Sequence, residues 1–188
     1  ETTKAYHSFR EANRRSSFED LDVDRTLITR YIERMLAVHS GPTQSNALES
    51  PVMNEPSPIF IVGFNCSGGS EIGRLLGLHV NFDRLGEKPA FDAARQALKG
   101  KDVGPLNELT DEDIQTARSK YFEVAHRGLK SGQRVIDTTP LNVLSLPLVH
   151  RLFPESCIIR MKRHPVETVF QAFRKLQRVN PISCHMDS

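Results

Sequence analysis

The 188-residue chain has little cysteine, little net charge and no long apolar runs. Its three cysteines, Cys66, Cys157 and Cys184, are too few and odd in number for a disulfide framework, which favours a reducing, cytoplasmic location. The 25 basic and 23 acidic residues leave a net charge of +2, too balanced to indicate a nucleic-acid partner. The longest apolar runs have about six residues, whereas a membrane-spanning helix needs about 20. No Cys/His spacing is typical of a zinc site, so we expect no metal.

Three segments of the chain differ in composition. Residues 1–40 carry apolar positions at helical spacing, which predict N-terminal helices; the family resemblance described below places them at the end of a repeat or linker region. Residues 41–57 are polar with three prolines and are typical of a linker. Residues 58–188 hold alternating strand and helix patterns and are expected to form the main domain. Both ends of the chain look cut, so we expect a fragment whose domain is incomplete at its C-terminus.

The pattern after residue 58 predicts an α/β fold. Continuous apolar runs indicate strands at 59–62, 134–137 and 157–161, the last of which is expected to bury Cys157. Helical patterns lie between them, while residues 80–108 look irregular. We therefore predict a P-loop-type three-layer fold with a central parallel sheet flanked by helices, preceded by the N-terminal helical segment. The loops after the three strands should meet at one edge of the sheet, where such folds bind ligands.

Two helices have local signals of their own. Residues 110–113, Thr-Asp-Glu-Asp, match a capping box and predict the start of a long helix. The segment 70–78 is expected to form a helix that turns Ile72, Leu75 and Leu76 inward.

The loop between the first strand and its helix has the sequence GFNCSG at residues 63–68, which fits G-x-x-x-x-G. Glycines let successive N–H groups point inward, and the helix that follows adds the positive end of its dipole, so such a loop favours a phosphate-like anion. Three alternatives stay open. One is a plain strand–turn–helix. The second is an ATP or GTP loop, which needs a lysine where this chain has Gly69 before Ser70. The third is a cysteine-phosphatase loop, which needs an arginine six residues after Cys66, where Ile72 stands.

Five segments, taken in order, resemble the tetratricopeptide-repeat-linked sulfotransferases, a family related to the protein-tyrosine sulfotransferases. The segments are AYHSFREANRR at 5–15, PIFIVGFNCSGGS at 58–70, LTDEDIQTARSKYF at 109–122, VIDTTPLNVLSLPLVHRLFPESCIIR at 135–160 and MKRHPVETVFQ at 161–171.

The resemblance implies an enzyme that transfers a sulfuryl group from 3′-phosphoadenosine 5′-phosphosulfate (PAPS) to an acceptor hydroxyl on a peptide tyrosine, a carbohydrate or a small molecule. It implies no metal, protein partners bound through flanking repeats, and a Golgi location if the chain sulfates tyrosine. It assigns Glu87 as the general base, and Arg163 and Gln171 to the 3′-phosphate. The residues that it assigns to the 5′-phosphosulfate are Asn65, Cys66, Ser67, Gly68, Gly69 and Ser70.

Three positions depart from the family pattern. Cys66 replaces an arginine, Thr138 replaces a lysine and Gln171 replaces a serine. Three hypotheses follow: an active sulfotransferase in which Arg74 or Lys162 supplies the missing charge, a catalytically impaired module that binds a nucleotide or a protein, and a scaffold whose repeats carry the function.

Overall fold

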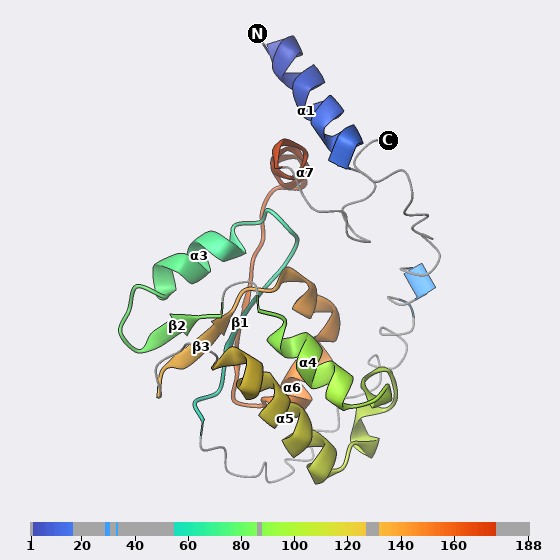
Figure 1. Ribbon diagram of the computed structural model, residues 1–188, viewed down its shortest axis with the longest axis vertical. Helices are drawn as coiled ribbons and strands as arrows, with labels where there is room; N and C mark the ends of the chain where they lie inside the picture. The colour runs from blue at the N-terminus through green and yellow to red at the C-terminus, as the bar shows by residue number, and fades with distance from the viewer. Residues whose placement is uncertain are drawn as a thin grey trace.

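The computed structural model describes residues 2–16, 29, 30, 33, 55–85, 88–126 and 132–175. From residue 59 onward, each strand is followed by one or more helices, as Figure 1 shows. No helix within the described ranges has the length and apolar character to cross a membrane. The elements in chain order are α1 (Thr2–Ser16), β1 (Ile59–Val62), α3 (Gly69–Leu76), β2 (Phe82–Arg84), α4 (Ala90–Ala97), η1 (Lys101–Val103), η2 (Leu106–Glu108), α5 (Asp111–Ala125), β3 (Arg134–Asp137), η3 (Pro140–Ser145), α6 (Leu146–Leu152), β4 (Cys157–Arg160) and α7 (Pro165–Arg174).

The sheet has four parallel strands in the order β2-β3-β1-β4. Ile59 of β1 pairs with Ile136 of β3 on one side and with Cys157 of β4 on the other. The connection from β1 runs to β2 at one edge of the sheet, whereas the connection from β3 runs to β4 at the opposite edge. The strand order therefore reverses between β1 and β3, and the carboxyl ends of these strands are where this kind of sheet binds ligands.

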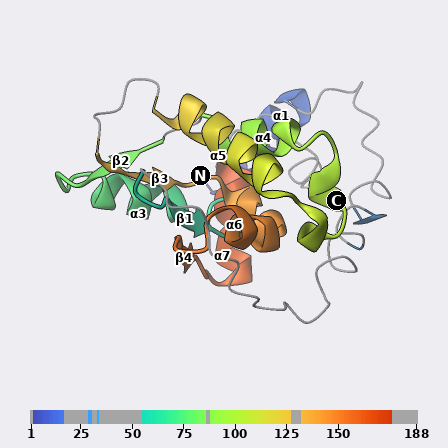
Figure 2. The ribbon, with the colours of Figure 1, turned by 90° about the horizontal axis from the view of Figure 1, so that it is seen from below.

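Helices cover both faces of the sheet, which confirms the predicted three-layer α/β fold (Figure 2). Phe60 and Val62 point into a core formed with α4, α5 and α6. Ile59 and Ile61 point to the opposite face, where Ile72 and Leu76 of α3 pack on them. All four residues of β1 are buried, as expected of a strand covered on both faces. The inward orientation predicted for Leu75 is wrong, because that side chain is 54% exposed.

The prediction of an irregular segment over residues 80–108 is wrong. The segment holds the edge strand β2 and the helix α4, followed by the two short turns η1 and η2. β2 has only three residues, all half-buried, so it lacks the apolar run of a central strand. α4 buries Ala90, Phe91 and Ala94 within a single short helix. Too few apolar positions repeat in either element to give a period that can be read from the sequence.

The burial predicted for Cys157 is also wrong. β4 lies at the edge of the sheet, and both Cys157 and its neighbour Ile158 are exposed. An apolar run signals a strand, but the run alone does not say whether the strand is central or at an edge.

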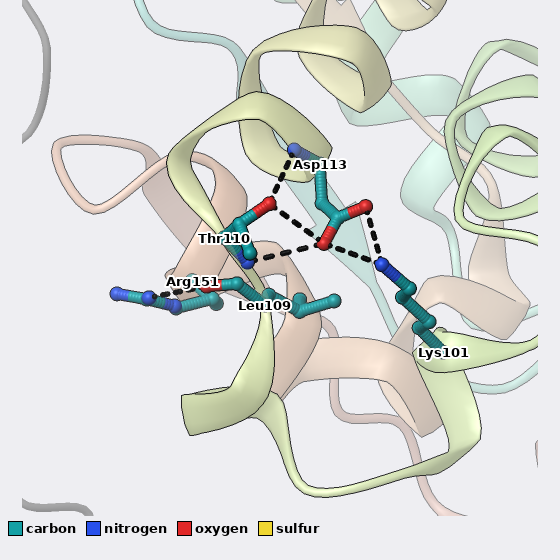
Figure 3. A network of polar contacts seen from close by, with 5 residues as sticks. All are labelled: Lys101, Leu109, Thr110, Asp113 and Arg151. Atoms are coloured by element: carbon teal, nitrogen blue, oxygen red, sulfur yellow. Dashed lines mark hydrogen bonds and ion pairs between the residues drawn. The ribbon is translucent and has the colours of Figure 1, made fainter.

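The N-terminus of α5 confirms the predicted capping box (Figure 3). The Asp113 N–H donates to Thr110 Oγ1 at 3.2 Å, and the Thr110 N–H donates back to Asp113 Oδ2 at 3.1 Å. Lys101 Nζ lies 2.8 Å from the same carboxylate and, together with Thr110, holds the pKa of Asp113 below its ordinary value. Arg151 Nη2 donates to the Leu109 carbonyl oxygen at 3.2 Å, just before the cap. This helix end is therefore closed by the chain's own side chains.

The predicted N-terminal helix is present as α1, and aromatic rings join it to α7. The ring of Tyr6 stacks on that of Phe173, with 5.5 Å between the ring centroids. Phe9 meets the same ring edge-on at 6.2 Å. These contacts anchor the C-terminal end of α7.

Candidate functional site

The loop between β1 and α3 is a tight turn that lies over Met161. Gly63 has φ +152°, and a Cβ at this position would come within 2.9 Å of the Met161 carbonyl oxygen. The Ser67 N–H donates to the Phe64 carbonyl oxygen at 3.2 Å and closes the turn. Cys66 takes the left-handed conformation, with φ 64°. Glycine is thus required at residue 63 by the close approach of two backbone segments.

The N-terminus of α3 is left open toward solvent. Its N-cap residue is Gly68, with φ 102° and ψ 6°, and no side chain caps the helix. The first helical hydrogen bond runs from the Ile72 N–H to the Gly68 carbonyl oxygen at 3.1 Å. The N–H groups of the preceding residues in the first turn have no carbonyl partner within the helix, and together with the helix dipole they attract an anion.

A small pocket that is open to solvent lies in front of this helix end, at the carboxyl ends of β1 and β3. It is therefore at the point where the strand order reverses. Among the described residues that line it, Lys175 is the one cation and Glu71 the one carboxylate. The lining residues are Ile61, Val62, Gly63, Phe64, Cys66, Ser67, Gly68, Gly69, Ser70, Glu71, Thr138, Pro140, Met161 and Lys175.

Thr138, which directly follows β3, also lines the pocket. It is 7% exposed, and its methyl group lies where only a glycine fits on α3: a Cβ at Gly73 would be 2.3 Å from Thr138 Cγ2. The preceding residue, Asp137, accepts a hydrogen bond from the Thr139 N–H at 2.9 Å and fixes this turn. Burial raises the pKa of Asp137, an effect that the hydrogen bond from Thr139 partly offsets.

Arg163 lies in the segment between β4 and α7 and contacts the glycine loop. Its Nη1 lies 3.4 Å from the Cys66 carbonyl oxygen, and its Nε lies 3.1 Å from Glu167 Oε2. The guanidinium therefore links the start of α7 to the glycine loop without lining the pocket. Gln171 is half-buried on α7 and does not line the pocket either.

A family model described as the sulfotransferase family matches residues 58–187. The chain belongs to the sulfotransferase family. The matched region contains the whole sheet, the glycine loop and α7. A search of curated proteins and a search of solved structures give no match to the chain.

The sulfotransferase fold brings most of the predicted loop residues into one place. Cys66, Ser67, Gly68, Gly69 and Ser70 all line the pocket, whereas Asn65 belongs to the same turn without lining it. The predicted general base, Glu87, lies outside the described residues.

The sequence did not single out three lining residues: Glu71, Met161 and Lys175. Glu71 could have been found, because it follows Ser70 directly and so belongs to the first turn of the helix. Met161 is the last residue of the predicted third strand, 157–161, and directly follows the observed strand β4 at the expected edge of the sheet. Lys175 has no local signal, because its approach to the loop depends on where α7 packs.

Proposed function

We propose that this sulfotransferase domain binds PAPS and transfers its sulfuryl group to an acceptor hydroxyl. The observation that carries the proposal is the uncapped, glycine-lined N-terminus of α3, which opens into a pocket at the reversal point of the sheet. Backbone N–H groups and a helix dipole suit the 5′-phosphosulfate, which carries its charge on several oxygen atoms. Ser67 and Ser70 add hydroxyl groups that can donate to these oxygens.

Arg163 is our candidate for the 3′-phosphate. A guanidinium can donate two parallel hydrogen bonds to a phosphate, and this one is 36% exposed beside the loop. Its contact with the Cys66 carbonyl, at 3.4 Å, is long and leaves donor groups for a ligand. Gln171, on the same helix, is proposed to add a hydrogen bond from its amide.

The proposed reaction is a direct in-line transfer. The acceptor oxygen attacks sulfur, and its proton passes to a general base, for which we propose Glu87. The bond between sulfur and the bridging oxygen breaks, and its electron pair stays on the 5′-phosphate of the departing 3′-phosphoadenosine 5′-phosphate. Charge thus accumulates at the loop as the bond breaks, where N–H groups of a fixed backbone can stabilise it.

One observation favours a second candidate, a module that binds the nucleotide without efficient transfer. The two positions at which the family pattern has cations hold Cys66 and Thr138, and Thr138 is packed against Gly73. Loss of a preorganised charge-stabilising group costs about 2.7–4 kcal/mol of transition-state stabilisation. Binding and catalysis therefore need separate tests.

Binding is tested by calorimetric titration of the folded chain with 3′-phosphoadenosine 5′-phosphate. We expect saturable binding, weakened about tenfold or more in Arg163→Met because a charge-assisted hydrogen bond is lost. Adenosine 5′-monophosphate, which lacks the 3′-phosphate, should bind both forms equally. Arg174→Met is the matched control, since Arg174 lies over the Phe170 ring at the other end of α7. Absence of any binding to the folded wild-type chain would overturn both candidate functions.

Catalysis is tested by following sulfuryl transfer from PAPS to a panel of phenolic and carbohydrate acceptors. Transfer by the wild-type chain would support the enzyme. Activity that appears only in the Cys66→Arg/Thr138→Lys double variant would instead support the binding module.

A further inference from the structure

The pocket contains a cation that does not come from the glycine loop. Lys175 lies immediately after α7 and lines the pocket together with Gly69 and Ser70. We infer that Lys175 contacts the 5′-phosphosulfate and supplies the positive charge that Cys66 and Thr138 do not. The inference rests on the proposed function and assigns a specific group to the reacting end of the PAPS site.

The backbone of Lys175 is held in place. Its N–H donates to the carbonyl oxygens of Gln171 at 3.1 Å and Ala172 at 3.3 Å, which closes the end of the helix. Ala172 is buried, and the neighbouring Phe173 ring stacks on Tyr6 of α1. The residue then leaves the helix with an extended backbone, φ −93° and ψ 114°. A backbone held in this way at the edge of the pocket, with a long side chain that lines it, can place an ammonium group on an anion.

The other nearby cations do not take this position. Arg74, Lys162 and Lys175 are all exposed, but Arg74 and Lys162 do not line the pocket, whereas Lys175 does. Arg163 is engaged with Glu167 and the Cys66 carbonyl at the edge of the loop. The earlier hypothesis that Arg74 or Lys162 compensates for the missing charge therefore gives way to Lys175.

The charges of the side chains that line the pocket explain the role that we assign to Lys175. Glu71 also lines the pocket, and its carboxylate repels an incoming phosphosulfate. The ammonium of Lys175 offsets this repulsion in the ground state. When the bond from sulfur to the bridging oxygen breaks, the electron pair passes to the 5′-phosphate, and the same ammonium offsets the charge that develops there.

The test compares two ligands on matched variants. We expect Lys175→Met to weaken binding of 3′-phosphoadenosine 5′-phosphate about tenfold to hundredfold, the range for a hydrogen bond to a charged group. Adenosine 3′-monophosphate lacks the 5′-phosphate, so its affinity should not change. Lys175→Arg should restore most of the affinity, and Lys162→Met, which removes an exposed lysine outside the pocket, should behave like the wild type.

The outcomes separate this inference from the proposed function. If the wild type binds 3′-phosphoadenosine 5′-phosphate and Lys175→Met binds it equally well, the role of Lys175 is overturned and the proposed function stands. An equal loss for both ligands also overturns it, because the effect would then not come from the 5′-phosphate. If the wild-type chain binds no bisphosphate nucleotide, the proposed function fails and this inference fails with it.

Discussion

The N-termini of α3 and α5 differ in whether side chains bind their unpaired backbone N–H groups. Each helix begins with N–H groups that have no partner within the helix. At α5, Thr110 and Asp113 exchange hydrogen bonds with the backbone, and Lys101 adds a charge contact. At α3, the cap residue is Gly68, which has no side chain to offer.

In our proposal the closed end of α5 contributes stability, whereas the open end of α3 binds the ligand. A cap closed by side chains contributes about 1 kcal/mol to stability. The open end at α3 forgoes that contribution, and in its place the chain has a pocket lined by glycine and serine. Substitutions at and around the two helix ends test this contrast.

Among these substitutions, replacing Gly73 of α3 by alanine should lower the stability of the protein most. The new Cβ would lie 2.3 Å from Thr138 Cγ2, and threonine is stiff about its first side-chain torsion. We expect the free energy of unfolding in urea to fall by about 2 kcal/mol, typical of overpacking. Adding Thr138→Ser removes the methyl group and should restore most of the loss. A double variant no more stable than Gly73→Ala would contradict the packing described here.

Replacing Gly68 by alanine should cost stability and also ligand affinity. Gly100 is a matched control, since it too is a left-handed N-cap glycine, with φ 90° and ψ −3°, and a Cβ there would meet no atom within 4 Å. Each variant should lose about 1–2 kcal/mol, because a side chain disfavours the left-handed conformation. Only Gly68→Ala should weaken binding of 3′-phosphoadenosine 5′-phosphate in calorimetry. Equal affinities in the two variants would argue that the loop does not hold the ligand.

Hydroxyl groups at the two helix ends should show opposite effects. Thr110→Ala should lower the free energy of unfolding by about 1 kcal/mol and leave nucleotide affinity unchanged, since it removes a cap. Ser70→Ala, at an exposed position in the pocket, should change stability by less than about 0.5 kcal/mol and weaken nucleotide binding. If Thr110→Ala weakened nucleotide binding as much as Ser70→Ala, the contrast would fail.

Two aspartates should give pH dependences of opposite sign, although the expected effects are the smallest. The pKa of Asp113 is lowered from 3.8, so its contribution to stability is present above that pH and is lost as the pH falls through the folded-state pKa. The pKa of buried Asp137 is raised from 3.8, so the protonated form favours the folded state at low pH, and stability falls as the pH rises through the folded-state pKa.

Urea unfolding between pH 3 and pH 7 checks this prediction. Relative to the wild type, Asp113→Asn should become less stable as the pH rises, and Asp137→Asn should become more stable. For each variant, the difference in free energy of unfolding from the wild type is plotted against pH. The signs of the two slopes decide the outcome, whereas a constant difference in stability does not. Slopes of the same sign would contradict the environments assigned to these carboxyl groups.

The parts of the molecule that the sequence predicts correctly are local. The apolar run of β1, the glycines at 63 and 68 and the capping box at Thr110 each lie within a few neighbouring residues. Each of these signals can therefore be found from adjacent residues, although the burial of β1 and the close approach of Met161 to Gly63 involve distant parts of the chain.

The features that the sequence does not predict depend on partners far along the chain. β2 exists because it pairs with β3, about fifty residues later, and Cys157 is exposed because β4 lies at the edge of the sheet. Likewise, Lys175 reaches the pocket only through the packing of α7 against α1 and beside the loop. The glycine loop of the site can therefore be predicted from the sequence, whereas the positive charge of Lys175 at the pocket depends on tertiary structure.

We propose that the open N-terminus of α3 holds the anionic end of the nucleotide. The most direct measurement is a set of backbone amide NMR spectra of ¹⁵N-labelled protein, titrated with 3′-phosphoadenosine 5′-phosphate. We expect large, saturable shifts for the amides of Gly68, Gly69 and Ser70, with those of Thr110 and Asp113 unchanged. Saturable binding that leaves the α3 amides unmoved would contradict it.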